Sequence, residues 1–262
     1  MQKSKKEERL GKEKLNNQGF LMKIIEYKNC CDIIVEFQDE YRSKVHTAYE
    51  NFMKGQVKNP YAPTVCGVGI IGNKYPACVN RISTKEFDTW CHMLKRCYDE
   101  KYKKENPTYQ NAACCEEWLY YPNFYEWLHN QKNFNKWVKL NKSGLDKDIL
   151  FKGNKFYNPA NCCLVPQNVN SLFTKHDMAR GDYPIGVTYN KKENKYRAIC
   201  NDPFANKRVC IGRYNTLEEA FQAYKNFKEN IIKQVAQIEF DKGNITKKCY
   251  EAMMKYEVEI TD

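Results

Sequence analysis

The amino-acid sequence predicts an α+β protein assembled from several small modules. Short runs of alternating apolar and polar residues, typical of half-buried strands, lie towards the two ends of the chain. Two aromatic-rich stretches in the middle have the three- and four-residue spacing of amphipathic helices. With 262 residues, of which 14% are aromatic, the chain can bury real hydrophobic cores. We therefore expect an N-terminal β-rich unit, a central aromatic core and a C-terminal sheet packed on a long helix.

The N-terminal part predicts a charged leader followed by a small β-rich unit. Residues 1–17 are basic and polar, and we expect a short exposed helix or a disordered arm. Residues 20–27 and 32–37 read as strands separated by a connection of hairpin length. A third strand near residues 41–45 and a helical turn at 48–52 complete this unit.

The central part predicts two helical regions and a small ββα finger. Apolar residues recur at helical spacing over residues 84–104, and a second aromatic helix or helix pair is expected over residues 116–139. These aromatic stripes indicate a core. A short strand from Leu145 to Ile149 and a loop containing Gly153 follow, and residues 158–161 are expected to open a helix-like stretch.

The C-terminal part predicts a three-stranded sheet and a long helix. Strand-like runs at residues 185–189, 195–199 and 208–214 are joined by polar turns. Apolar residues then recur at three- and four-residue steps from Leu217 to Val235, which predicts one apolar helix face packed on the sheet.

Basic side chains lie on these strands and not only in a tail. Residues 184–213 contain seven Lys or Arg against two Asp or Glu, a local balance of +5. Alternation places Lys195 and Arg197 on one face of the second strand. In the third strand Arg208 and Arg213 fall on opposite faces, although a β-bulge would exchange faces. This pattern favours a polyanion partner, the alternative being a solvated sheet on a generally basic protein.

The same residues resemble the Apetala2-type DNA-binding domain. The resemblance rests on IGVTY at 185–189, KYRAI at 195–199, RVCIGRY at 208–214 and the helix that follows as far as Tyr224. It implies a three-stranded antiparallel sheet that enters the DNA major groove with the helix behind it. Phosphates or guanine edges would then be contacted by the basic strand residues, with two tyrosines supporting them by packing: Lys195, Arg197, Arg208 and Arg213, with Tyr189 and Tyr196.

The central segment resembles the HNH endonuclease family. Lys147-Asp148-Ile149 stands where the family pattern has Asp-His-Ile, and Asn158 and Asn161 match its middle asparagines. Val165-Pro166, with Asn168 or Asn170, matches the end of the pattern, and the tryptophan-rich residues upstream are similar to phage and prophage proteins of this kind. The resemblance implies an active site with Asp148, Asn158 and Asn161 in catalytic positions.

The departure from this family concerns its histidine. The HNH histidine takes a proton from water while a divalent ion polarises the phosphate. Here no histidine lies between His129 and His176, and an aspartate carboxyl, with an ordinary pKa of about 4, is a poor base at neutral pH. Asp146 and Asp148 together offer carboxylates for Mg²⁺, or they are surface groups that pair with nearby lysines. A decayed scaffold, a working variant and a coincidental likeness remain open.

Composition limits the cellular context and the partners. The chain has 43 Lys or Arg against 32 Asp or Glu, a net charge of +11, which favours an acidic partner. Its 13 cysteines include no CxxC spacing, so free thiols in a reducing cytosol are expected, without zinc. No apolar run is long enough to cross a membrane. Together with the free thiols, the resemblance to phage and prophage proteins implies a protein of the bacterial host cytoplasm.

These observations predict a phage or mobile-element protein that binds double-stranded DNA and carries an inactive HNH-like core. One alternative is a phage-encoded protein that inhibits a host defence complex by direct contact. The other is an active, metal-dependent HNH-type endonuclease that uses Mg²⁺, so whether the chain is an enzyme stays open. The predicted segments are a basic leader, a β-rich unit, an HNH-like domain, an Apetala2-like domain and a C-terminal tail, at residues 1–17, 18–62, 63–178, 182–240 and 241–262.

Overall fold

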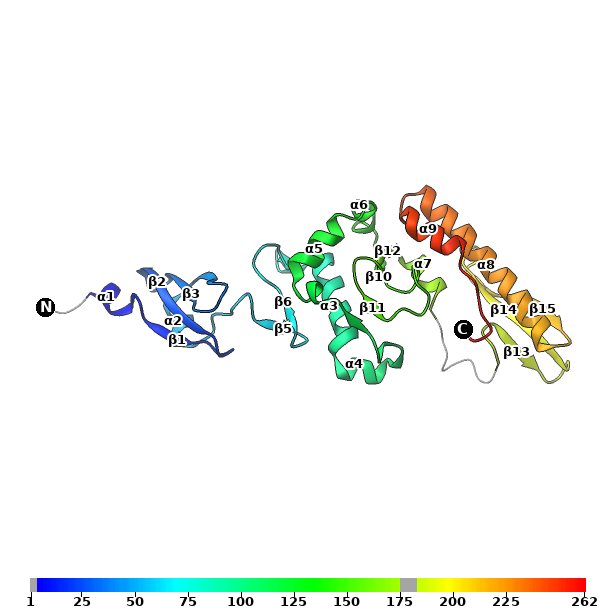
Figure 1. The fold of residues 1–262 in the computed structure, drawn as a ribbon, viewed down its shortest axis with the longest axis horizontal. Coiled ribbons are helices and arrows are strands. Elements are labelled where there is room, and N and C mark those ends of the chain that lie inside the picture. Colours follow the sequence, from blue (N-terminus) through cyan, green and yellow to red (C-terminus); the bar gives the residue numbers. More distant parts are fainter. Residues whose placement is uncertain (1–3, 175–182) are drawn as a thin grey trace. The chain divides into compact units, whose positions relative to one another are not determined.

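The computed structural model describes residues 4–174 and 183–262. It contains helices and antiparallel sheets, and the C-terminal three-stranded sheet is followed by a long helix, so the predicted α+β class is confirmed (Figure 1). The chain divides into two compact units, residues 1–110 with 116–125 and residues 111–115 with 126–262. Among the described residues, no helix has the length and apolar character needed to cross a membrane.

The first unit begins with a four-stranded antiparallel sheet in the order β1-β2-β3-β4. Alternation along β3 buries Ile33, Val35 and Phe37 against Phe52 of α2. The elements of this part are α1 (Lys5–Arg9), β1 (Glu13–Leu15), β2 (Leu21–Asn29), β3 (Asp32–Phe37), β4 (Lys44–Thr47) and α2 (Tyr49–Met53).

Two expectations for this region need correction. The leader is not a helix or an arm throughout, because β1 pairs with β2, with Glu13 opposite Lys23. The third predicted strand begins later than expected, at Lys44. The reason is Asp39, whose Oδ1 accepts hydrogen bonds from the backbone N–H groups of Tyr41 and Arg42 and so holds these residues in a turn.

The rest of the first unit is helical with short hairpins. The helix predicted over residues 84–104 is two helices, because Asp99 has an extended backbone and its side chain caps the second by accepting the N–H of Tyr102 at 2.9 Å. The elements are β5 (Pro63–Val65), β6 (Gly69–Ile70), β7 (Cys78–Val79), β8 (Ile82–Ser83), α3 (Lys85–Tyr98), α4 (Glu100–Glu105), η1 (Pro107–Tyr109) and η2 (Glu116–Leu119), and the division between the units falls within α5 (Tyr121–His129).

The second unit contains the predicted ββα segment, with β12 inserted where a helix was expected. The first strand ends at Asp146, and residues 163–166 form a buried strand before the helix begins at Gln167. The expectation that a helix begins at residues 158–161 was therefore wrong. The Asn158 side chain accepts backbone hydrogen bonds that form a turn, and residues 163–165 are a continuous buried apolar run, which is typical of a strand. The elements are β9 (Ala113–Cys114), α6 (Phe134–Trp137), β10 (Ser143–Asp146), β11 (Phe156–Tyr157), β12 (Cys163–Pro166) and α7 (Gln167–Leu172).

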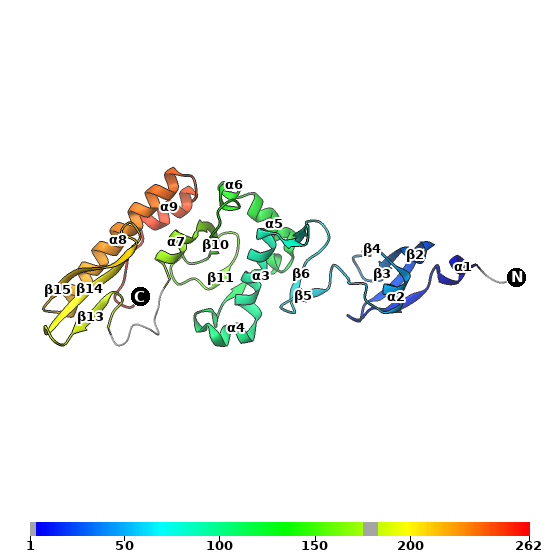
Figure 2. The ribbon, with the colours of Figure 1, turned by 180° about the vertical axis from the view of Figure 1, so that it is seen from behind.

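The C-terminal sheet has the order β13-β14-β15, and α8 covers one of its faces (Figures 1 and 2). The helix begins with a capping box, in which Thr216 Oγ1 accepts the Glu219 N–H and the Glu219 carboxylate accepts the Thr216 N–H, each at 3.2 Å. The elements are β13 (Val187–Asn190), β14 (Lys195–Asp202), β15 (Lys207–Tyr214), α8 (Leu217–Asp241) and α9 (Lys247–Met254).

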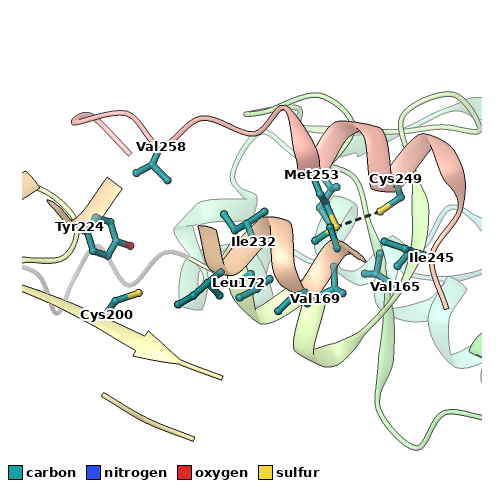
Figure 3. Packing of buried hydrophobic residues seen from close by; sticks show 14 of the residues in the cluster. Val165, Val169, Leu172, Cys200, Tyr224, Ile232, Ile245, Cys249, Met253 and Val258 are labelled. Atoms are coloured by element: carbon teal, nitrogen blue, oxygen red, sulfur yellow. Dashed lines mark hydrogen bonds between the residues drawn. The ribbon is translucent and has the colours of Figure 1, made fainter. Parts of the chain in front are cut away.

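One hydrophobic core joins the ββα segment to the C-terminal sheet. Val169 of α7, Ile232 of α8 and Met253 of α9 are buried together with Ala198 of β14 (Figure 3). The sequence segments 63–178, 182–240 and 241–262 thus contribute to the same core, and α8 runs through the boundary expected after residue 240. The ββα segment and the basic sheet therefore belong to one folded body.

Candidate nucleic-acid interface

The pairing of the strands fixes which side chains share a face of the C-terminal sheet. Ala198 is buried in the core with α8 and lies opposite Gly212 of β15. One residue along, Arg197 lies opposite Thr188 of β13 and Arg213 of β15. Directly opposed residues project from the same side of an antiparallel sheet, and neighbours along a strand project from opposite sides. Thr188, Arg197 and Arg213 therefore form a row on the side away from α8.

A bulge in β15 brings a further arginine to this side. The pairing shifts between Ala198 and Ile199, so that Ile211 is an extra residue without a partner. Beyond it, Arg208 lies opposite Asn201, which shares a side with Arg197. The sequence-based assignment of Arg208 and Arg213 to opposite faces was wrong because of this extra residue. The side away from α8 is named the open face here and comprises Thr188, Asn190, Lys195, Arg197, Ile199, Asn201, Arg208, Cys210 and Arg213.

The basic groups of the open face have few partners among the residues that the structure describes. Lys195 Nζ donates to the Asn215 side chain, and Arg213 Nε donates to Glu193 Oε2 at 2.8 Å in an exposed ion pair. Such surface pairs contribute about 0–1 kcal/mol and exchange readily for another anion. The Arg197 Nε is buried and has no hydrogen-bond partner among the residues that the structure describes.

The predicted supporting tyrosines lie on the other side of the sheet. Tyr189 is opposite Tyr196, with ring centroids 5.0 Å apart, and both project towards the α8 side. The Tyr189 hydroxyl donates to Asn194 in the β13–β14 turn. Tyr189 is thus placed to support the strands by packing on the α8 side, whereas the four predicted basic residues lie on the open face.

A glycine brings the sheet close to its helix. Gly186, just before β13, has φ of +76°, and a Cβ there would lie 2.0 Å from the Tyr224 ring of α8. Any side chain at this position would displace the helix from the strand, in addition to the strain of a left-handed backbone. Gly186 therefore fixes the spacing that leaves one face covered and the other free.

In the HNH-like segment, the two aspartates already have partners. Asp146 Oδ1 accepts the backbone N–H groups of Asp148 and Ile149 at 2.7 and 2.8 Å. Burial raises the pKa of the Asp146 carboxyl, and these hydrogen bonds only partly oppose the shift. Both oxygens of Asp148 accept hydrogen bonds from Lys147 Nζ at 2.7 Å, and Lys147 is only 4% exposed.

The asparagines of this segment also shape the loop. Asn158 Oδ1 accepts the N–H groups of Ala160 and Asn161, and Asn161 Nδ2 donates to Asn154 Oδ1 at 3.4 Å. Over residues 4–174 and 183–262, no three His, Cys, Asp or Glu side chains converge as metal ligands. A lysine ammonium on Asp148 also competes directly with a cation. The donor set therefore does not fit Mg²⁺.

Sequence reasoning missed the role of Asn168, a residue of the HNH-like match. Its Nδ2 donates to Glu239 Oε1 of α8 at 3.1 Å, while Asn244 Nδ2 donates to Glu239 Oε2 at 2.7 Å. Burial opposes ionisation of Glu239, but these bonds together with one from Lys242 hold its pKa below the usual range. In the sequence, the only sign of these hydrogen bonds is that Glu239 is an acidic residue on the apolar face of a helix.

Comparison with known proteins adds no family assignment. No family model matches the chain, and neither a curated protein nor a solved structure shows significant similarity to it.

Proposed function

We propose that this protein binds double-stranded DNA with the open face of the C-terminal sheet. Four cations from two strands share that face, α8 packs against the other, and Arg208 and Arg213 are exposed. Three strands spaced 4.7–4.9 Å apart span roughly 10 Å, which is comparable with the ~12 Å width of the major groove. The resemblance to phage and prophage proteins supports a phage or mobile-element origin.

The observation that carries the proposal is the arginine row. Arg197 and Arg213 are directly opposed, and like charges in that position destabilise a sheet. The buried Nε of Arg197 adds a donor without a partner among the described residues, which costs further free energy. A DNA phosphate bound by the two guanidinium groups would offset the repulsion between them. Such an arrangement is expected where a ligand completes the site.

The experiment measures duplex affinity and its salt dependence for the full chain. We expect Arg197→Ala and Arg213→Ala each to lose about 1–3 kcal/mol where the arginine reads a base, or to lower the salt slope by about one where it contacts a phosphate. Lys233→Ala is the matched control, because it removes the same charge from the exposed side of α8. The proposal is contradicted if the wild-type protein shows no salt-dependent DNA binding, or if Lys233→Ala weakens DNA binding as much as Arg197→Ala does.

We further propose that the HNH-like segment is a structural element and does not cut DNA. The support is the Lys147–Asp148 pair, which places an ammonium where a divalent ion would have to bind. Plasmid nicking with Mg²⁺ or Mn²⁺ should not exceed that of an Asp146→Asn, Asp148→Asn variant. Metal-dependent nicking that disappears in this variant would instead establish an endonuclease.

A further inference from the structure

A cavity of about 660 Å³ lies beside β14, at the point where β13 has ended. β13 pairs with residues 195–198 of β14, and the Ile199 N–H donates to the Gly186 carbonyl at 2.7 Å, so residues 200–202 of β14 have β15 on one side only. The cavity lies on the other side, is open to solvent and is bordered by α7 and α8, with Ser171, Thr174, Asn201, Arg208, Tyr224 and Lys228 among its walls. Cys200 and Tyr224 also line the cavity, and Figure 3 shows both at one end of the drawn core.

Two cations reach this cavity. Arg208 comes from β15, and Lys228 lies one helical turn after Tyr224 on α8. Neither makes an ion pair with any residue in the described part of the chain, whereas Lys225 pairs with Glu229 and Lys242 with Glu239. An ammonium held in a partly buried site without an anion is unfavourable.

The electrostatic surroundings of Lys228 contain no compensating acid in the described residues. Burial lowers its pKa, and the Cys200 thiol is the only titratable neighbour that opposes this shift. Lys228 also lines an adjoining small pocket together with Asp262, whose carboxylate already accepts a hydrogen bond from Lys152 at 2.8 Å. The anion that would pair with Lys228 is therefore expected to come from outside the described chain.

The remaining walls limit the kind of anion. Leu172, Ile185, Ile199 and the Tyr224 ring supply apolar surface, and hydroxyl and amide groups supply hydrogen bonds. The volume lies within the roughly 300–1,000 Å³ of small-molecule sites. We propose that this cavity binds a small organic phosphate, with the phosphate between Lys228 and Arg208 and the organic part against the apolar wall. This site is distinct from DNA binding but shares Arg208 with the open face.

Pyridoxal 5′-phosphate is a suitable probe, because it carries a phosphate monoester and an aldehyde. In the molecules whose Lys228 amine is neutral, Arg208 holds the phosphate and the amine attacks the aldehyde carbon. The carbonyl oxygen leaves as water, and added borohydride reduces the resulting imine to a secondary amine. Burial enlarges the neutral fraction of this amine near pH 8. In the full-length protein, peptide mass spectrometry should find Lys228 modified before the exposed Lys233.

Three matched measurements decide the proposal. Inorganic phosphate should protect Lys228, and Arg208→Ala should reduce its modification about tenfold, since a charge-assisted bond to phosphate is lost. Lys228→Arg retains a cation without the reactive amine, so phosphate should still raise its Tm, whereas Lys228→Met should lose that rise. The site is contradicted if Lys228 is modified no faster than Lys233. It is also contradicted if added phosphate or the Arg208→Ala substitution leaves the modification of Lys228 unchanged.

Separate variants distinguish a wrong phosphate-site proposal from a wrong DNA-binding proposal. Arg213→Ala should weaken DNA binding while Lys228 is modified as in wild type, because Arg213 is not part of the cavity wall. Lys228→Arg should bind DNA as wild type does, because Lys228 lies on α8 and not on the open face. Loss of Lys228 modification in Arg213→Ala would contradict a separate phosphate site.

Discussion

The open face of the C-terminal sheet and the loop after β10 differ in how their polar groups are satisfied. In the loop, the Asp146, Asp148 and Asn158 side chains each accept two hydrogen bonds from within the chain. On the open face, Arg197 retains a buried N–H without an acceptor among the described residues. Both regions were predicted from the sequence to be functional sites. Under the proposed function, this difference separates a ligand site from a structural loop, which residue type alone does not do.

Substitutions in the two regions should therefore change the free energy of unfolding differently. Removing a group that satisfies buried partners leaves those partners unpaired, which costs about 1–3 kcal/mol for each. Removing a group that is itself unsatisfied relieves a cost instead. A structural region therefore loses stability on substitution, and a ligand site loses affinity with little change in stability.

The largest effect on stability is expected at Asp146. Asp146→Ala leaves the backbone N–H groups of Asp148 and Ile149 without their acceptor, so we expect a loss of about 2–6 kcal/mol in the free energy of unfolding. Asp146→Asn keeps an acceptor oxygen and should lose much less. Urea unfolding of the two variants measures this difference, and equal losses would show that the turn is not held by this oxygen.

The Lys147–Asp148 pair should give a smaller, coupled effect. Asp148→Ala leaves the buried Lys147 ammonium without its carboxylate, and we expect a loss of about 2–3 kcal/mol, moderated because the Asp148 side chain is 41% exposed. Adding Lys147→Met removes the stranded charge and should restore most of the stability. A double-mutant cycle without coupling would remove the basis for treating this pair as the reason that Mg²⁺ does not fit.

A pH-dependent effect is expected at Glu239. Its pKa is lowered in the folded protein, so its contribution is complete above the unfolded pKa of about 4.3 and is lost as the pH falls through the lower folded value. Glu239→Gln should therefore be about 1–2 kcal/mol less stable than wild type near pH 7, and the difference should shrink in acid. Unfolding free energies across this pH range test the sign. A difference that is constant with pH would indicate that the charge does not matter.

Much of the fold follows from local sequence patterns. The strands at residues 20–27 and 32–37, the three C-terminal strands and the helix after Thr216 were all predicted near their observed bounds, because alternation and capping are local signals. The break at Asp99 and the strand after residue 162 were not predicted, because they depend on one capping side chain and on burial on both faces.

For the candidate nucleic-acid interface, the sequence predicted which basic residues take part but not how they are arranged. The four basic residues were named from the sequence, yet their common face depends on Ile211, an extra residue that no periodicity reveals. Lys228 was missed because a single lysine on the apolar stripe of a long helix is indistinguishable from one that reaches solvent. The unpaired state of a side chain depends on residues distant in sequence, so only the folded chain shows it.

The smallest expected change in stability is at Arg197, and it completes the comparison. Arg197→Thr removes one of two opposed like charges and the buried N–H without a described acceptor, and it places a good strand former in a central strand. We expect the free energy of unfolding to change by no more than about 0.5 kcal/mol, or to rise, while duplex affinity falls. Urea unfolding and DNA titration on the same preparation measure both quantities. A loss of several kcal/mol in stability would show that Arg197 holds the sheet together, and the open face would then resemble the loop after β10 rather than contrast with it.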